Sequence, residues 1–159
     1  MATDCLFCTT LLPSARLADV TVYEDDLVYA SHVVDEDGLT YLGQLILQTK
    51  RHVPGYAELT DGEAIAIGLA IVRISRALKA CTDAEKIYVV TFAEVVPHLH
   101  TYLTSRYPGT PPQYWRMNIE NWPDAPQGDR GAVVSLCECL RSTIESAART
   151  HTLDSVRPE

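Results

Sequence analysis

The first half of the chain alternates apolar and polar positions in a way that predicts β-strands. Val20–Val34 carries β-branched and aromatic residues around an acidic turn at 24–26, and this pattern predicts a hairpin. Gly43–Gln48 is largely apolar and predicts a third strand. Two more strands are predicted over Lys86–Val95 and His98–Tyr107. Together these segments predict a five-stranded sheet.

The pattern changes to a helical period in two places. Thr60, followed three residues later by Glu63, forms a capping box, and apolar residues then recur at helical spacing up to Leu78. A long amphipathic helix is therefore predicted there. A loop from Pro108 to Asp129 contains both tryptophans, and a final helix is predicted over about 131–149. Helices between and after meandering strands indicate an α+β fold with an antiparallel sheet.

Length and charge limit what the chain can be. A chain of 159 residues fits a single domain over 1–159. The net charge of −8 argues against nucleic acid or an anionic membrane as a partner, because both attract clustered Lys and Arg. No apolar run approaches the roughly 20 residues of a membrane helix, and the N-terminus lacks a basic segment followed by an apolar one. We expect a cytoplasmic protein.

The spacing of Cys5 and Cys8 indicates a metal site. Two thiolates from this CxxC pair, with His52 and His98 as distant partners, would satisfy the tetrahedral preference of Zn²⁺. Four protein ligands would leave no open position, so the zinc would be structural. Two alternatives remain: the cysteines are simply small buried residues, or they form a redox pair.

The remaining cysteines are interpreted differently. An odd total of five favours reduced thiols and metal ligands over a disulfide framework. Cys81, Cys137 and Cys139 are therefore expected to be reduced thiols of the core or of helices.

His98 and His100 form a second candidate site. On a strand, side chains two positions apart share a face, so His98, His100 and Tyr102 are expected to line one surface. A neutral imidazole is a good nucleophile and a good metal ligand near pH 7. Taken alone, such a pair is more often a surface or structural pair than a functional one.

These motifs occur in an order that resembles the histidine triad (HIT) superfamily. The chain has CLFC at 5–8, VYEDD at 22–26, KRHV at 50–53, ELTD at 58–61 and PHLH at 97–100. The resemblance covers about 1–106, and 107–159 would be a C-terminal extension with a loop and a helix. It implies a HIT-like fold.

The resemblance also implies a chemistry. The middle histidine of the family motif matches His100 and would attack the α-phosphorus of a nucleotide, forming a covalent nucleotidyl-imidazole. This implies a nucleotide hydrolase or nucleotidyltransferase acting on dinucleoside polyphosphates, nucleoside phosphoramidates or related mixed anhydrides. Zinc-bearing members use ligands that match Cys5, Cys8, His52 and His98. Homodimerisation through the long helix and a sheet edge is a further implication.

The chain departs from the family pattern at several positions. Tyr102 replaces the third histidine, and a phenol can donate a hydrogen bond but cannot carry positive charge. The stretch 91–96 lacks the family's polar donors, and Val33 falls where many members carry an acid. Gln44 stands where some members carry histidine and is a candidate substrate-binding residue. Arg106 is a second candidate for binding phosphate, or else a surface residue.

These departures leave two other functions open. One is a pathway enzyme with an altered pocket, in which His100 acts as a general base on a non-nucleotide substrate. The other is a nucleotide-binding protein with weak catalysis. Trp115 and Trp122 either stack on a ligand or pack the C-terminal region onto the domain, and packing is the preferred interpretation.

Overall fold

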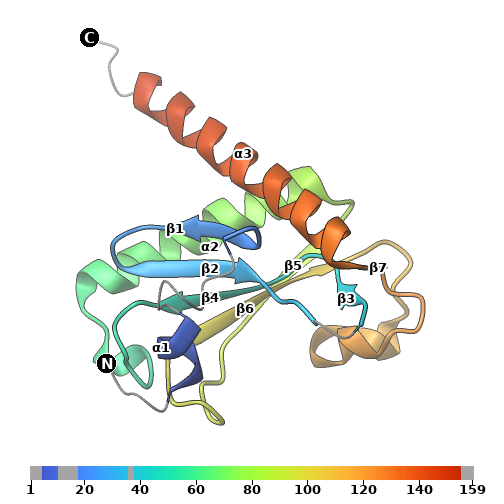
Figure 1. Cartoon of the computed structure of the whole chain (residues 1–159), viewed down its shortest axis with the longest axis horizontal. Helices are drawn as coiled ribbons and strands as arrows, with labels where there is room; N and C mark the ends of the chain where they lie inside the picture. The colour runs from blue at the N-terminus through green and yellow to red at the C-terminus, as the bar shows by residue number, and fades with distance from the viewer. Residues whose placement is uncertain (1–4, 11–17, 36–37, 155–159) are drawn as a thin grey trace.

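One antiparallel sheet of five strands organises the chain (Figure 1). The structure is a computed structural model that describes residues 5–10, 18–35 and 38–154, with side chains described as far as 149. The strand order is β1-β2-β4-β6-β5, and every neighbouring pair is antiparallel. The strands are β1 (Thr21–Glu24), β2 (Val28–His32), β4 (Gln44–Thr49), β5 (Lys86–Val90) and β6 (His100–Arg106). The predicted sheet and α+β class are confirmed.

Two long helices pack on one face of this sheet. Helix α2 (Asp61–Cys81) begins at the predicted capping box, in which Thr60 and Glu63 bond reciprocally. Helix α3 (Arg130–Asp154) packs beside α2 and against β1. Apolar side chains of the sheet, such as Leu45, Leu47 and Leu103, meet the helices in a fully buried core. No helix in the described part of the chain is long and apolar enough to cross a membrane.

Several short elements have no hydrophobic period and could not be predicted. They are α1 (Leu6–Thr10), β3 (Thr40–Tyr41), η1 (Tyr56–Glu58), η2 (Pro112–Tyr114), η3 (Arg116–Asn121) and β7 (Gln127–Gly128). The segment that contains η2 and η3 is held by a second apolar cluster, in which Trp122 packs with Tyr41 and Tyr107. The indole N–H of Trp115 donates to the carbonyl of Thr110. Trp122 therefore packs the C-terminal segment onto the chain, whereas the hydrogen bond of Trp115 lies within that segment.

Two predicted strands have different limits in the structure. Strand β5 ends at Val90 rather than Val95, and β6 begins at His100 rather than His98. Residues 91–99 instead form an irregular connection, because the backbone N–H of Leu99 bonds to Val53 outside the sheet. His98 therefore does not lie on the strand that carries His100.

The expectation that all the other cysteines are reduced is wrong for one pair. Cys81 at the end of α2 and Cys139 in α3 form a disulfide, 58 residues apart in the sequence. The packing of α3 beside α2 brings the Cα atoms of the two cysteines to 6.0 Å, within the range that a disulfide spans. Cys137 is a free, fully buried thiol, as expected. The cysteine pattern therefore does not by itself indicate a reducing compartment.

Candidate active site and metal cluster

The face of the sheet opposite α2 and α3 carries a row of polar side chains. The register between β4 and β6 places Gln44 opposite Thr104, Ile46 opposite Tyr102 and Gln48 opposite His100. Paired residues of antiparallel strands share a face. We call these six residues the open face: Gln44, Ile46, Gln48, His100, Tyr102 and Thr104. The sequence-predicted residues Gln44, His100 and Tyr102 therefore lie on one surface.

Helix α1 covers one end of the open face. Phe7 is buried, and its ring lies 4.2 Å from the imidazole of His100 between centroids. The side-chain amide of Gln48 donates to the carbonyl of Phe7 at 3.1 Å and so ties α1 to β4. His100 is only 8% exposed as a result. A five-residue helix is too short to be stable alone, so these contacts hold it in place.

The orientation of the His100 imidazole is fixed by a backbone carbonyl. Its Nδ1 lies 2.7 Å from the carbonyl oxygen of His98. A carbonyl can only accept a hydrogen bond, so Nδ1 carries the proton in this arrangement. In the neutral ring the lone pair must then be on Nε2. His100 thus has the tautomer that a nucleophile or general base at Nε2 requires.

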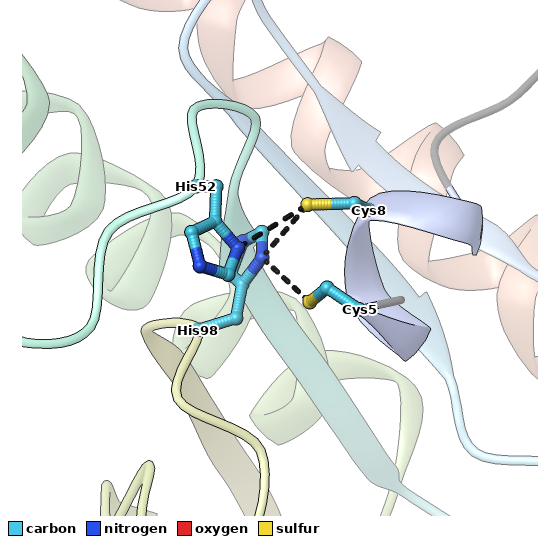
Figure 2. A group of neighbouring side chains, drawn as sticks. All are labelled: Cys5, Cys8, His52 and His98. Atoms are coloured by element: carbon cyan, nitrogen blue, oxygen red, sulfur yellow. Dashed lines mark hydrogen bonds between the residues drawn. The ribbon is translucent and has the colours of Figure 1, made fainter. Parts of the chain in front are cut away.

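Cys5, Cys8, His52 and His98 form one compact cluster, although they come from three distant parts of the sequence (Figure 2). Their candidate ligand atoms all lie within 4.8 Å of one another. Nδ1 of His98 is 3.5 Å from each sulfur, and Nδ1 of His52 is 3.4 Å from Sγ of Cys8. Tetrahedral Zn²⁺ with ordinary bond lengths would separate sulfur and nitrogen by about 3.6 Å. The cluster therefore fits the dimensions of a tetrahedral zinc site.

The hydrogen bonds of His98 also prepare it to be a ligand. Its Nε2 lies 2.8 Å from the carbonyl oxygen of Thr49, so Nε2 carries the proton and Nδ1 presents its lone pair to the sulfurs. Burial lowers the pKa of His98, which favours the neutral form that binds metals. Such a carbonyl partner fixes both the tautomer and the ring orientation of a ligand histidine. His98 thus links the two sites, since its carbonyl orients His100.

Two adjoining cavities open on the sheet beside His100. The first, of about 500 Å³, is lined by His100 together with Phe7, Val95 and Val96. The second, of about 300 Å³, lies over the other end of the open face and is lined by Gln44, Thr104 and residues of η3. Phe92 and Tyr102 line both cavities. The two cavities therefore meet at Phe92 and Tyr102.

The candidate residues Tyr102 and Gln44 meet a residue that the sequence analysis missed. The amide nitrogen of Gln44 donates a short hydrogen bond to Oε1 of Glu120 in η3. Burial raises the pKa of Tyr102, and the negative charge of Glu120 raises it further. The phenol of Tyr102 is therefore a stable proton donor at neutral pH. Its ring packs edge-on against His100 at 5.6 Å.

Arg106 lies at the opposite end of β6 from His100. Six residues of extended strand separate the two Cα atoms, which corresponds to roughly 20 Å. The guanidinium of Arg106 pairs with Glu85 at 2.9 Å and lies over the ring of Trp115 at 4.7 Å. The structure does not bring it to the other candidate residues.

A different arginine, Arg116, lines the second cavity together with Glu120. Both come from η3, in a segment whose sequence has no period that predicts its position. Their spacing of four residues was the only signal in the sequence, and it indicates a local charge pair rather than a site.

Comparison with solved structures identifies the fold. A Zn-bound histidine triad family protein from Mycobacterium smegmatis superposes with a TM-score of 0.66 at 18% identity, covering 92% of this chain and 97% of that one. The chain has the histidine triad fold. A hypothetical histidine triad nucleotide-binding protein from Sulfolobus tokodaii gives a TM-score of 0.65 at 20% identity, covering 89% and 93% of the two chains.

A third solved structure also shares this fold. It is a Hit-like protein involved in cell-cycle regulation from Bartonella henselae, with a TM-score of 0.61 at 19% identity over 90% of this chain and 98% of that one. No protein-family model and no curated protein matches the sequence. The histidine triad fold is thus shared with these structures at 18–20% sequence identity.

Proposed function

We propose that the chain is a divergent histidine triad enzyme that acts at a phosphorus centre of a nucleotide-like substrate, with Nε2 of His100 as the nucleophile. The observation that carries the proposal is the hydrogen bond from Nδ1 of His100 to the carbonyl of His98. It leaves the lone pair on Nε2, on a residue that lines a cavity of about 500 Å³. Hydrolysis and transfer to another acceptor share this first step.

The reaction would proceed in two displacements. Nε2 of His100 attacks phosphorus, the Nε2–P bond forms, and the bond to the leaving group breaks. The leaving group departs with the electron pair, accepts a hydrogen bond from Tyr102 and takes a proton from solvent. Water then attacks phosphorus, releases a proton to solvent, and the electron pair of the Nε2–P bond returns to His100. The carbonyl of His98 stabilises the positive charge of the phosphorylated imidazole throughout.

The proposal includes a structural zinc ion held by Cys5, Cys8, His52 and His98. The four residues provide two sulfur and two nitrogen ligands, which leaves no position for substrate. Bound zinc would supply rigidity rather than reactivity. Because His98 provides both a ligand nitrogen and the carbonyl that orients His100, that rigidity would reach the nucleophile.

We also propose that the enzyme is a homodimer. Helix α2 presents an exposed apolar stripe made by Ile65, Leu69 and Val72, at helical spacing. Strand β5, which pairs with β6, is an edge strand of the sheet, and its Val89 is exposed. An apolar helix stripe beside an unpaired strand edge is a surface that a second copy would bury.

Light scattering coupled to size exclusion tests the dimer. Leu69→Glu should give a monomer, because it places a charge within the stripe. Leu39→Glu is the matched control, since Leu39 is equally exposed but lies outside α2. A monomeric wild-type protein at micromolar concentration would overturn the dimer.

The decisive test of the chemistry follows both turnover and covalent mass. Purified wild-type protein is incubated with nucleoside polyphosphates, nucleoside phosphoramidates and acyl nucleotides, and rapid quenching is followed by intact-mass spectrometry. We expect turnover and a nucleotidyl adduct in the wild type, and a loss of at least about a thousandfold in His100→Ala. Unchanged metal content and melting temperature in His100→Ala would show that the loss is chemical.

A second candidate function has support from the cavity beside His100. Its lining is mostly apolar, and Glu94 is its one charged residue. An anionic phosphate gains little there, whereas a general base acting on a non-nucleotide substrate needs no cation. Absence of any adduct or turnover across the panel would favour this altered-pocket enzyme. Nucleotide-dependent thermal stabilisation without turnover would instead indicate a binding protein.

A further inference from the structure

The second cavity carries two opposite charges on one short helix. Arg116 and Glu120 both line it and both belong to η3. In a 3₁₀-helix with three residues per turn, positions four apart are rotated by about 120° from each other. In an α-helix the same two residues would be neighbours and would pair. No ion pair joins the two side chains within the described residues.

Neither charge is neutralised by an ion pair within the described residues. The described salt bridges involve neither Arg116 nor Glu120. The carboxylate of Glu120 is instead held by the amide of Gln44, which is 6% exposed on the sheet. An amide fixes the position of a carboxylate without cancelling its charge.

The backbone at Arg116 is in an uncommon conformation. Its φ is 65°, in the left-handed region that non-glycine residues rarely adopt. Residues held in this conformation concentrate at ligand sites. Arg116 is also the one positively charged residue lining either of the two cavities within the described part of the chain. It is thus the group beside the open face that can provide the positive charge that Tyr102 lacks.

The geometry points to a subsite for a small zwitterionic group in this cavity, with Arg116 facing its anionic part and Glu120 its ammonium. This inference rests on the proposed function, because the zwitterion would be the leaving group or acceptor attached to the phosphorus at His100. A volume of about 300 Å³ suits a group of this kind. Polyphosphate leaving groups carry several negative charges, which one guanidinium beside two carboxylates, Glu94 and Glu120, cannot balance. The subsite therefore selects against dinucleoside polyphosphates.

Binding to the inactive protein tests the subsite without turnover. Calorimetry on His100→Ala would use adenosine monophosphate joined through a P–N bond to propylamine, β-alanine, ethylenediamine or diaminopropionate. Propylamine adds no charge, β-alanine adds a carboxylate, ethylenediamine adds an ammonium, and diaminopropionate adds both. We expect diaminopropionate to bind at least tenfold more tightly than propylamine, and diadenosine tetraphosphate to bind more weakly than any of the four. A tenfold change corresponds to about 1.4 kcal/mol.

Two charge-removing variants separate the roles of the two residues. Added to His100→Ala, Glu120→Gln should abolish the preference for the ammonium and Arg116→Gln the preference for the carboxylate. Arg76→Gln and Glu138→Gln are matched controls, because both residues are exposed on α2 and α3 and line neither cavity. Equal affinity for all four compounds, or preferences that survive in both variants, would overturn the subsite.

The outcomes keep this inference distinct from the proposed function. Charge-selective binding with no turnover in the wild type leaves the subsite standing and removes the phosphorus chemistry. Turnover in the wild type without charge-selective binding removes the subsite and leaves the phosphorus chemistry standing. No measurable binding of any compound contradicts both.

Discussion

The two ends of the open face are built in opposite ways. At the anchored end, defined by the Cys5–Cys8–His52–His98 cluster and His100, four of these five side chains are buried. At the dipolar end, defined by Gln44, Tyr102, Arg116 and Glu120, the two charged residues are exposed on η3. His100 is thus held by the core of the fold, and the charged groups proposed to select a ligand are held by a surface segment.

This difference separates stability from selectivity. Every bond that orients His100 passes through buried residues, so a change there should alter folding as well as chemistry. Arg116 and Glu120 contribute little to the core, so changes there should alter ligand preference alone. The four experiments below test this separation, from the largest expected effect to the smallest.

Removing a cluster cysteine should have the largest effect. Cys8→Ser removes a thiolate that contacts both His52 and His98. We expect bound zinc, measured by elemental analysis, to fall well below one per chain, and the unfolding free energy to fall by on the order of 5 kcal/mol. Cys137→Ala is the control, because it is a buried free cysteine outside the cluster and should retain the metal. Wild-type protein purified without metal and unaffected by Cys8→Ser would rule out the zinc site.

Breaking the Cys81–Cys139 disulfide should have an intermediate effect confined to the opposite face of the sheet. The bond closes a 58-residue separation, and its loss should lower the unfolding free energy by about 2–4 kcal/mol. Urea denaturation with and without a phosphine reductant measures this loss. The Cys81→Ser/Cys139→Ser variant should match the reduced wild type and keep its metal and ligand preference. A change in ligand preference on reduction would couple the two faces and contradict the separation.

Replacing His32, which lies between the core and the dipolar end, should have a smaller effect on the unfolding free energy, and this effect should depend on pH. Its Nε2 accepts the backbone N–H of Gly43, next to Gln44, and burial lowers its pKa. The unfolded chain therefore takes up a proton below about pH 6.5 that the folded chain resists. The stabilisation that His32 contributes is fully present above about pH 6.5, and it is lost as the pH falls towards the pKa of His32 in the folded state.

His32→Leu isolates this contribution from that of other groups. The variant leaves the N–H of Gly43 without its partner and should cost about 1–3 kcal/mol at pH 7.5. Its unfolding free energy should decline less between pH 6.5 and 5 than that of the wild type. The neighbouring thiol of Cys137, whose pKa burial raises to about 11, stays neutral over this range. If the unfolding free energies of His32→Leu and the wild type declined equally between pH 6.5 and 5, His32 would not be the source of this pH dependence.

Removing the charge of Glu120 should have the smallest effect on stability. Glu120→Gln keeps the side-chain length and an acceptor for the amide of Gln44, so the unfolding free energy should change by less than about 0.5 kcal/mol. The apparent pKa of Tyr102, followed by ultraviolet absorbance, should decrease because a negative charge near it is lost. A destabilisation as large as that of His32→Leu would place Glu120 in the structural framework instead.

The sequence predicted the elements whose positions are marked by a local residue pattern. The capping box at Thr60 marked the start of α2, and β-branched runs located the hairpin and β4. The cluster of Cys5, Cys8, His52 and His98 could be anticipated because metal ligands are chemically distinctive whatever their distance in sequence.

Features that depend only on tertiary packing could not be anticipated. The disulfide requires α2 and α3 to lie side by side, and nothing in the spacing of Cys81 and Cys139 encodes that. Arg106 precedes the loop as a plausible phosphate ligand, yet Glu85 from the chain just before β5 pairs with it. Arg116 enters the cavity only because the aromatic cluster around Trp122 folds its segment back over the sheet.

The exposed position of η3 has a consequence for protein engineering and for divergence. A library randomised at Arg116, Met117 and Glu120 would sample new ligand preferences while leaving the buried core and His100 unchanged. On the proposed function, such changes would alter the choice of substrate without altering the anchored end, so proteins with matching anchored ends need not share a substrate.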